Sequence, residues 1–188
     1  MATHTAVGDG HGLAPHHDDY TAYHHMVGTA RIGLWLFIIS DGFMFGALFF
    51  SRFYLLGGER PELSQELGLI VTSVLLLSSF FMNRAETLIA HGDKRGFIIS
   101  TILTIILGLG FFVGVVAIEW PQAITHIGGP GTNAMASIFF MMTGMHAFHV
   151  ITGIIFLLIV LLNGIKGRFS VERHWMVEAC ANYWHFVD

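Results

Sequence analysis

The chain has 188 residues, of which 54% are hydrophobic and 12% are charged, and its formal net charge is −4. A soluble domain carries about 25% charged residues, so this composition indicates an integral membrane protein. The nine Lys and Arg residues are divided among several loops, which excludes a nucleic-acid-binding footprint. Cys180 is the single cysteine, so neither a disulfide within the chain nor a Cys-rich metal centre can form.

Residues 1–30 are polar and lack apolar periodicity, and we expect a flexible, His-rich cytoplasmic tail. Its six histidines are His4, His11, His16, His17, His24 and His25. Imidazole is a common metal ligand, but a flexible tail has no scaffold to fix a coordination geometry. A solvated tail with incidental histidines is therefore the favoured interpretation. The tail shows no cleavable signal peptide, so the first span should serve as the insertion signal.

The stretch at 32–56 is almost continuously apolar and contains one carboxylate, Asp41. A helix of this length is about 37 Å long, enough to cross a bilayer with some tilt. Asp41 lies about 14 Å along that axis, near mid-membrane. An ionised Asp facing lipid there costs at least about 2.5–3.5 kcal/mol. We therefore expect Asp41 to be protonated or turned toward protein or water.

Four further helical segments follow, and together with the first they predict spans at about 32–56, 64–90, 97–118, 134–162 and 175–188. Ser64 is the expected cap of the second helix. The third span should end at Glu119-Trp120-Pro121, because Pro interrupts helices and Trp suits the membrane interface. The last segment is too short to span and has no helix stop, so the natural chain is expected to continue for roughly two or three turns.

The predicted fold is an all-α membrane protein: a bundle of five transmembrane helices over residues 31–188, with the last helix cut short. Glycine pairs one turn apart, Gly42-xxx-Gly46 and Gly110-xxx-Gly114, predict places where a neighbouring helix packs closely.

Alternating spans put seven Lys and Arg residues on the side of the N-terminal tail: Arg31, Arg84, Lys94, Arg95, Lys166, Arg168 and Arg173. Only Arg52 and Arg60 fall on the other side, so the positive-inside rule places the N-terminus in the cytoplasm.

Polar residues within the spans form the candidate site. His146 and His149 are three residues apart and share one helix face, while His174, Glu178, Asn182 and His185 recur along one side of the last segment. Two histidines on one helix cannot supply opposite axial ligands to a haem, but they could share a metal with Glu178. We favour a hydrogen-bonded polar seam made of His146, His149, Glu178, Asn182 and His185, without metal. Its expected specific contact is His149 with Glu178.

Two other functions stay open on the residues alone. Asp41, the histidines and Glu178 are residue types that membrane proton relays use, which suggests a stand-alone transporter or channel. A complete path needs polar groups in both halves of the bilayer, and the second and third spans offer only Thr and Ser. The other alternative is a membrane enzyme with a metal at His146, His149 and Glu178.

Three runs of sequence are distinctive: RIGLWLFIISDGFMF at 31–45, TGMHAFHVITG at 143–153 and YWHFVD at 183–188. Together they resemble subunit III of the haem–copper respiratory oxidases, the cytochrome c oxidase or quinol oxidase subunit 3. The chain is similar to the short five-helix bacterial form, which lacks the first two of the family's seven helices. The resemblance implies a non-catalytic subunit of a proton-pumping terminal oxidase in the bacterial plasma membrane, an enzyme that reduces O₂ to water.

The resemblance also implies partners and ligands. The partners would be catalytic subunit I, subunit II, a small subunit IV and membrane lipids, with haems and copper in the partner subunits and none in this chain. A bound phospholipid would lie between helices. The family's carbodiimide-reactive carboxylate falls on Asp41, which would face a neighbouring subunit and support its proton uptake. Candidate lipid or interface residues, chosen mainly by their positions near span ends, are Arg84, His91, Glu119, Arg173 and Trp175.

Overall fold

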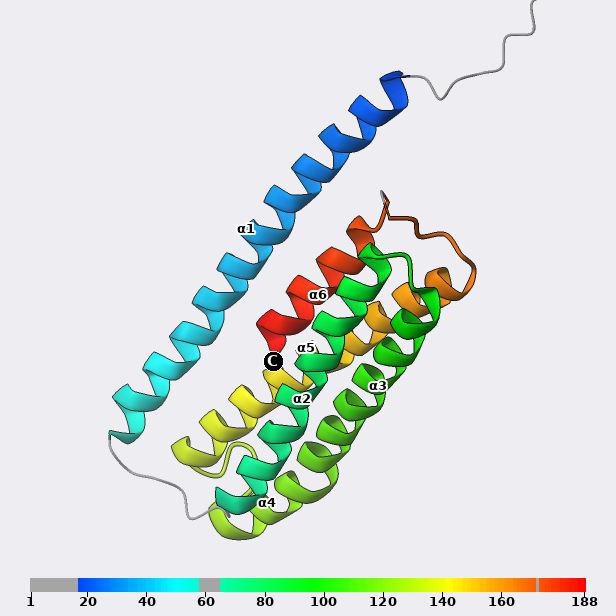
Figure 1. Cartoon of the computed structure of the whole chain (residues 1–188). Helices are drawn as coiled ribbons and strands as arrows, with labels where there is room; N and C mark the ends of the chain where they lie inside the picture. The colour runs from blue at the N-terminus through cyan, green and yellow to red at the C-terminus, as the bar shows by residue number, and fades with distance from the viewer. Residues whose placement is uncertain (1–16, 58–64, 172) are drawn as a thin grey trace, which may run out of the picture.

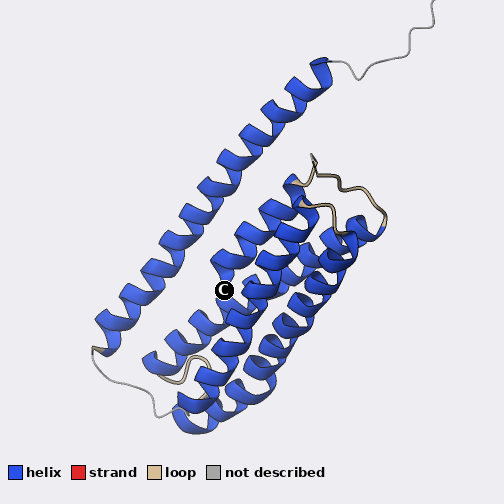
Figure 2. Cartoon of the chain, in the orientation of Figure 1, coloured by secondary structure: helices blue, strands red, loops and turns tan. Residues whose placement is uncertain are grey.

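The computed structural model describes residues 17–57, 65–171 and 173–188, and all regular structure within these ranges is helical (Figures 1 and 2). The elements are α1 (His17–Leu56), α2 (Gln65–Ala90), α3 (Lys94–Val113), η1 (Gly114–Glu119), α4 (Trp120–Ile127), α5 (Ala134–Ile165) and α6 (Trp175–Val187). Figure 1 shows α2, α3, α5 and α6 side by side in a bundle, with α1 along one flank. The prediction of an all-α fold is confirmed.

Within the part of the chain that the structure describes, four helical segments are long and apolar enough to cross a membrane: Thr21–Leu56, Gly68–Ala90, Lys94–Ile127 and Ala134–Ile165. They correspond to the first four predicted spans. α6 begins at Trp175, as expected, and has 13 residues. A membrane-spanning helix needs about 20 residues, more than the 13 that α6 has within this sequence.

α1 begins at His17, so the expectation of a flexible tail as far as residue 30 is wrong for residues 17–30. Once a helix exists, each added residue gains a backbone hydrogen bond without a new nucleation cost. No proline interrupts this extension, because Pro15 precedes α1. The histidines before residue 17 and the expected Ser64 cap lie outside the described residues.

The third span also differs from expectation, because it continues through Pro121 to Ile127. The residues directly before α4 form the π-helical turn η1. At its end, the Trp120 N–H donates to the Val115 carbonyl. In an α-helix, a proline ring clashes with the carbonyl four residues earlier. The wider π-helical turn changes the backbone spacing that produces this clash. Pro121 then occupies the first turn of α4, where its missing N–H is tolerated. The helix ends at Gly128, whose φ of 90° favours glycine.

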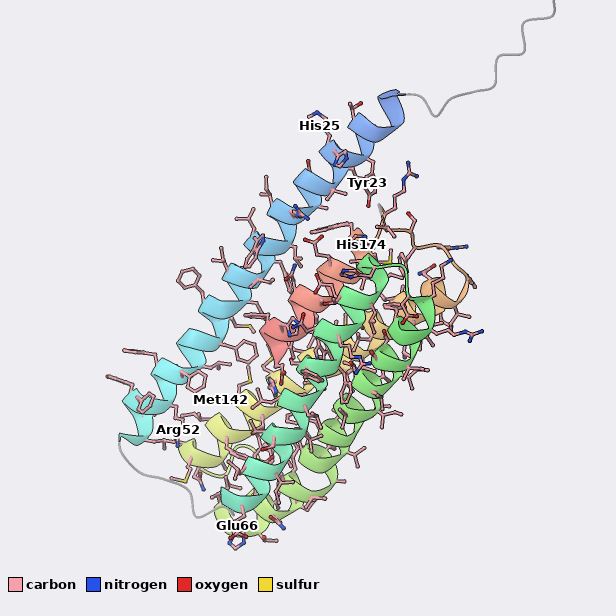
Figure 3. All side chains as sticks on the ribbon, in the orientation of Figure 1. Tyr23, His25, Arg52, Glu66, Met142 and His174 are labelled. Atoms are coloured by element: carbon pink, nitrogen blue, oxygen red, sulfur yellow. The ribbon has the colours of Figure 1, made fainter. Side chains whose placement is uncertain are left out.

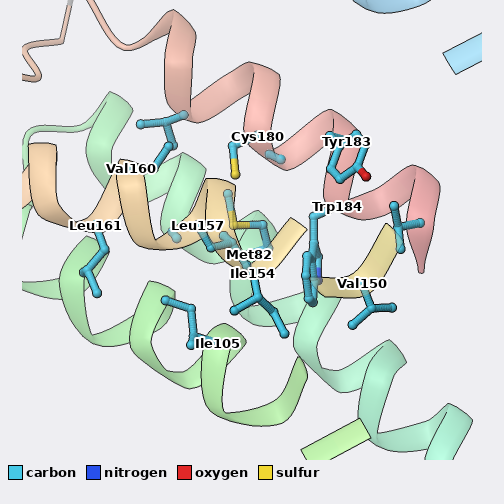
Figure 4. Close-up of a cluster of buried hydrophobic side chains, with 14 of the residues drawn as sticks. Met82, Ile105, Val150, Ile154, Leu157, Val160, Leu161, Cys180, Tyr183 and Trp184 are labelled. Carbon is cyan, nitrogen blue, oxygen red and sulfur yellow. The ribbon is translucent and has the colours of Figure 1, made fainter. Parts of the chain in front are cut away.

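Trp184 lies at the centre of the bundle core, with 1% of its surface exposed (Figure 4). Its indole N–H donates to Ser78 Oγ at 3.0 Å, which joins α6 to α2. The ring faces two glycines: a Cβ placed on Gly108 or Gly153 would lie 2.6 or 2.9 Å from a ring carbon. These glycines are required because α3 and α5 approach the indole ring closely.

The predicted glycine notches correspond only in part to close helix contacts. A Cβ on Gly114 would lie 3.5 Å from Val71, and one on Gly42 would lie 4.0 Å from Phe186. A Cβ on Gly46 or Gly110 would meet nothing within 4 Å. Within this chain, Gly46 and Gly110 face away from the neighbouring described helices, so the expected close packing is seen only at Gly42 and Gly114.

α1 is peripheral in this fold. The buried share of its most apolar window is 6%, compared with 39% for α5. It packs on α5 and α6, and much of its remaining surface consists of large apolar side chains. Exposed members of that surface include Ile32, Trp35, Leu36, Ile39, Phe43, Phe50 and Phe53. In a bilayer these side chains face lipid or another protein chain.

Candidate functional site

Asp41 of α1 and His149 of α5 form a buried pair near the middle of the bundle. His149 Nε2 lies 3.1 Å from Asp41 Oδ2, and each side chain is 9% exposed. This distance permits an ion pair, but the alignment is not that of a hydrogen bond, and Asp41 Oδ2 has no hydrogen-bond partner among the described residues. Asp41 is therefore largely buried within its own chain, and its expected contact with a neighbouring subunit stays a prediction.

The orientation of His149 restricts where protons can lie. Its Nδ1 is 2.7 Å from the Met145 carbonyl oxygen, which can only accept a hydrogen bond. Nδ1 therefore carries a hydrogen, and Nε2 faces Asp41. The Nε2 atom is therefore the part of the imidazole that can interact with the Asp41 carboxyl group. A partner this close reduces the cost of a carboxyl group at this depth.

Aromatic rings enclose the His149 imidazole. Phe45 of α1 and Phe148 lie edge-on to it, with ring centroids 5.3 and 5.8 Å away. The Tyr183 hydroxyl donates to the His149 backbone carbonyl at 3.3 Å, which ties α6 to the same turn of α5. His146 joins His149 in the wall of a cavity of 180 Å³, and Phe111 lies edge-on to His146 at 5.4 Å. The structure thus brings the two predicted histidines to one side of α5.

The expected contact between His149 and Glu178 is wrong. Glu178 accepts two hydrogen bonds from the Arg31 guanidinium, at 2.8 and 2.9 Å. The two residues lie at different depths: Glu178 is about 5 Å from the start of α6, whereas His149 is about 24 Å from the adjoining end of α5. The α5–α6 connection joins those two helix ends, so the histidine lies too deep in the bundle to reach the carboxylate.

The C-terminal part of the predicted polar stripe on α6 contacts α2. His185 Nδ1 lies 3.2 Å from Ser79 Oγ, and the same hydroxyl donates to the Asp188 carboxylate. Asn182 is half-buried between these two ends of α6. The expected single seam of five residues is therefore divided into three groups: Asp41 with His149 and His146, Glu178 with Arg31, and His185 with Ser79 and Asp188.

The donor set for a metal is not assembled at the predicted place. His146 and His149 lie together, but Glu178 is occupied by Arg31 at another level of the bundle. Across residues 17–57, 65–171 and 173–188, no three His, Cys, Asp or Glu side chains gather closely enough to hold a metal ion. The alternative of a metal at His146, His149 and Glu178 is therefore contradicted by the geometry.

Three of the predicted interface residues lie on or directly after α2 and on η1. Arg84 is exposed on the C-terminal half of α2. His91 is exposed in the turn directly after α2, and its Nδ1 lies 2.8 Å from the Thr87 carbonyl oxygen. Glu119 is half-buried at the end of η1. It lines a cavity of 340 Å³ that also contains His146 and Asp188 in its wall.

The other two interface residues, Arg173 and Trp175, contact α1. The Arg173 guanidinium lies 5.3 Å from the Tyr23 ring centroid, and the Arg31 guanidinium lies 5.2 Å from the Trp175 ring centroid. Figure 3 shows Tyr23 and His174 near the same end of the molecule, with Arg52 at the opposite end of α1. Arg173 and Trp175 thus help to join α1 to the loop before α6 and to α6 itself.

An apolar groove of 390 Å³ separates this contact from the Asp41–His149 pair. Its walls come from three helices: Leu34 and Phe37 of α1, Phe156, Ile159 and Val160 of α5, and Met176, Ala179, Cys180 and Tyr183 of α6. The lining exposes no polar surface. Such a groove excludes water and suits a hydrocarbon guest.

A family profile described as cytochrome c oxidase subunit III matches residues 16–188. The chain belongs to this family. Cytochrome c oxidase subunit 3 of the carp Cyprinus carpio and of the chicken Gallus gallus are each 36% identical to it over 171 residues. The Xenopus laevis protein of the same name is 38% identical over the same length. Each match covers 84% of this chain and 64% of the relative, so the chain spans less than two thirds of the length of these relatives.

Family membership favours the oxidase-subunit interpretation over the transporter or channel. The chain is an integral membrane protein of the cytochrome c oxidase subunit III family, and the resemblance noted in the sequence is confirmed. The alternative of a stand-alone transporter or channel gains no support from the comparisons. The profile match includes both helices that carry the Asp41–His149 pair.

Sequence reasoning missed several residues that the structure places in the site. Arg31 was counted only as a positive charge, although it lies one turn before the groove-lining residue Leu34. Ser79 and Tyr183 were not singled out as partners of the polar side chains. No spacing along the chain points to these contacts, because their partners lie on helices far away in sequence.

Proposed function

We propose that this chain is a non-catalytic subunit III of a haem–copper terminal oxidase, the class of enzyme that reduces O₂ to water and pumps protons. The observation that carries the proposal is the family match, which extends over residues 16–188. Haems and copper would be held by partner subunits, and this chain would stabilise the catalytic one. The partners are subunit I, subunit II and a small subunit IV, and the location is a bacterial plasma membrane.

The exposed apolar surface of α1 supports an assembled state. α1 buries few of its apolar residues inside this chain, so it has a large face available to another membrane protein.

The N-terminus would be cytoplasmic. In support, Lys94 and Arg95 begin α3, and Lys166 and Arg168 follow the end of α5 at the same end of the bundle, the face expected to be cytoplasmic.

We also propose that a phospholipid binds in the apolar groove between α1, α5 and α6. Its acyl chain would lie against Leu34, Phe156 and Met176, which are among the lining residues. Arg31 and Arg173 lie near the end of the groove and supply positive charge at the level expected for headgroups. The apolar groove would thus hold the acyl chain, and the two arginines would lie near the charged headgroup.

A third part of the proposal concerns protons. Asp41 would support proton uptake by the catalytic subunit, and His149 would hold its carboxyl group in place. Carboxyl and imidazole groups are residue types that membrane proton relays use, which supports a role for the pair in local proton exchange. The position of the Asp41–His149 pair within the bundle favours a role in assisting proton uptake by the catalytic subunit over proton conduction by this chain alone.

Purification through an affinity tag on this chain tests the central claim. The preparation should contain a haem–copper catalytic subunit, detected by its haem absorption spectrum and by mass spectrometry of its peptides. A preparation of the folded chain without any haem–copper subunit would contradict the proposal. Native mass spectrometry of the same preparation should find phospholipid that survives delipidating detergent washes.

A further inference from the structure

A pair of opposite charges lies next to one end of the apolar groove. The Arg31 guanidinium donates to both oxygens of the Glu178 carboxylate, at 2.8 and 2.9 Å. Arg31 is one helical turn before the lining residue Leu34, and Glu178 directly precedes the lining residue Ala179. A lipid whose acyl chain lies in the groove would therefore have its headgroup beside both charges.

Both members of this pair can be reached from outside the chain. The Arg31 side chain is 53% exposed and the Glu178 side chain is 27% exposed. Both hydrogen bonds come from Arg31 Nη2, so the other N–H groups of the guanidinium donate to no carboxylate among the described residues. A carboxylate likewise has more lone pairs than two hydrogen bonds use. Each charged group can therefore bind a further partner of opposite charge.

The charges around the pair are balanced. Glu86 of α2 is close enough to Glu178 for their charges to interact. The Arg173 guanidinium lies over the ring of Tyr23, two turns before Arg31 on α1. Two carboxylates and two guanidinium groups thus gather here in the part of the chain that the structure describes. An anionic headgroup would add an unbalanced negative charge, whereas a headgroup with one charge of each sign keeps the balance.

We propose that the Arg31–Glu178 pair selects phospholipids whose headgroup carries a primary ammonium group beside its phosphate, as phosphatidylethanolamine does. The phosphate would accept hydrogen bonds from Arg31, and the ammonium group would donate to Glu178. A choline headgroup has the same two charges, but its quaternary nitrogen has no N–H to donate. A glycerol headgroup has no positive charge for Glu178. This selection rests on the proposed lipid binding in the groove, and it makes Glu178 the residue that determines the headgroup.

Photo-cross-linking in the purified complex tests the selection. Three phospholipids would carry the same diazirine-labelled acyl chain and differ only in an ethanolamine, choline or glycerol headgroup. Adducts are counted on the peptides of this chain that contain the lining residues Phe156 and Met176, so lipids bound to other subunits do not contribute. The ethanolamine lipid should give about three- to tenfold more adduct than either of the others, the range expected for charge-assisted hydrogen bonds between partly exposed groups.

Variants of the pair separate the two contacts. Glu178→Gln should abolish the preference for ethanolamine and leave the glycerol lipid's adduct unchanged or higher, because the amide neither attracts an ammonium group nor repels an anion. Arg31→Gln should lower the adducts of all three lipids, since each carries a phosphate. Glu66→Gln is the matched control, because Glu66 is an exposed carboxylate at the opposite end of the molecule from His174 (Figure 3). It should change none of the three yields.

Groove-filling variants distinguish failure of the lipid site from failure of the headgroup selection. Ala179→Phe on α6 and Ile159→Trp on α5 each place a large ring in the groove and should lower all three adducts. Adducts that neither variant lowers would overturn the groove as the lipid site. Groove-dependent adducts with equal yields for the three headgroups, or a preference that survives Glu178→Gln, would overturn the selection and leave lipid binding in place.

A soluble competitor distinguishes a membrane lipid from a free metabolite of the same chemistry. Phosphoethanolamine carries the same phosphate and ammonium groups but has no acyl chain to bury in the groove. It should therefore leave the adduct of the ethanolamine lipid unchanged at concentrations where unlabelled phosphatidylethanolamine competes. Competition by phosphoethanolamine at those concentrations would overturn the lipid as the guest.

Discussion

Trp184 of α6 donates its indole hydrogen to the Ser78 hydroxyl of α2 at 3.0 Å, although 106 residues separate the two. The Ser78 hydroxyl in turn donates to the Leu75 carbonyl at 2.6 Å. The indole is therefore held by a polar contact inside an apolar core, where water is not available to replace it. This arrangement makes Trp184 the residue through which α2, α3, α5 and α6 are joined.

Trp184→Phe should lower the stability of the bundle. The change removes the bond to Ser78 and leaves space beside Gly108 and Gly153, with an expected loss of about 1–3 kcal/mol. Thermal unfolding of the purified protein measures the effect. Trp35→Phe is the matched control, because Trp35 is 54% exposed. Equal shifts in the two variants would show that Trp184 has no special role.

Gly108→Ala should destabilise the protein through overpacking. The new methyl group would lie 2.6 Å from a Trp184 ring carbon, and such crowding costs about 1–3 kcal/mol. Gly110→Ala on the same helix meets nothing within 4 Å and should be neutral or slightly stabilising, because alanine favours helix more than glycine does. The comparison of their unfolding midpoints checks the prediction, and a neutral Gly108→Ala would contradict it.

Asp41→Asn should leave assembly largely intact and slow proton uptake. Asparagine has the same shape and can bond to His149 Nε2, but it cannot release a proton. Asp41→Leu should lower the yield of assembled complex as well, because it leaves the buried imidazole without its partner at a cost of about 1–3 kcal/mol. Complex yield and sustained O₂-reduction rates distinguish the variants. Failure of Asp41→Asn to assemble would instead indicate that a charged Asp41 is essential.

Asn133→Ala should weaken the connection between α4 and α5. The Asn133 side chain accepts from the Ala136 N–H at 2.7 Å and donates to the Ile127 carbonyl at 2.8 Å, so it caps one helix and closes the end of another. Loss of an N-cap costs about 0.5–2 kcal/mol. Hydrogen exchange of the first turn of α5 should therefore accelerate. Asn133→Asp keeps the acceptor and should retain most of the protection, and equal exchange in both variants would argue against capping.

Several elements could be predicted because their signals lie within short stretches of sequence. The apolar runs located α2 and α5 closely, and the start of α6 at Trp175 follows the basic turn before it. The start of α1 was missed because a polar sequence without apolar periodicity can still extend an existing helix. The end of the third span was missed because the π-helical turn η1 changes how Pro121 fits.

The candidate site could be predicted only as a set of residues. Asp41, His146 and His149 do lie together, but Glu178 was assigned to the wrong partner. Residue spacing shows which side chains share a face of one helix. It does not show at which depth two helices meet, and that depth places Glu178 beside Arg31.

The sequence by itself therefore determined the membrane-bound, all-helical fold, the position of Asp41 inside a span and the family, because hydropathy and motifs are properties of neighbouring residues. Only the tertiary structure decided that Asp41 faces His149, that Arg31 holds Glu178 and that Trp184 packs between Gly108 and Gly153. These contacts depend on the rotation and axial position of helices that are distant in the chain. Those quantities are determined by the packing of all the helices together.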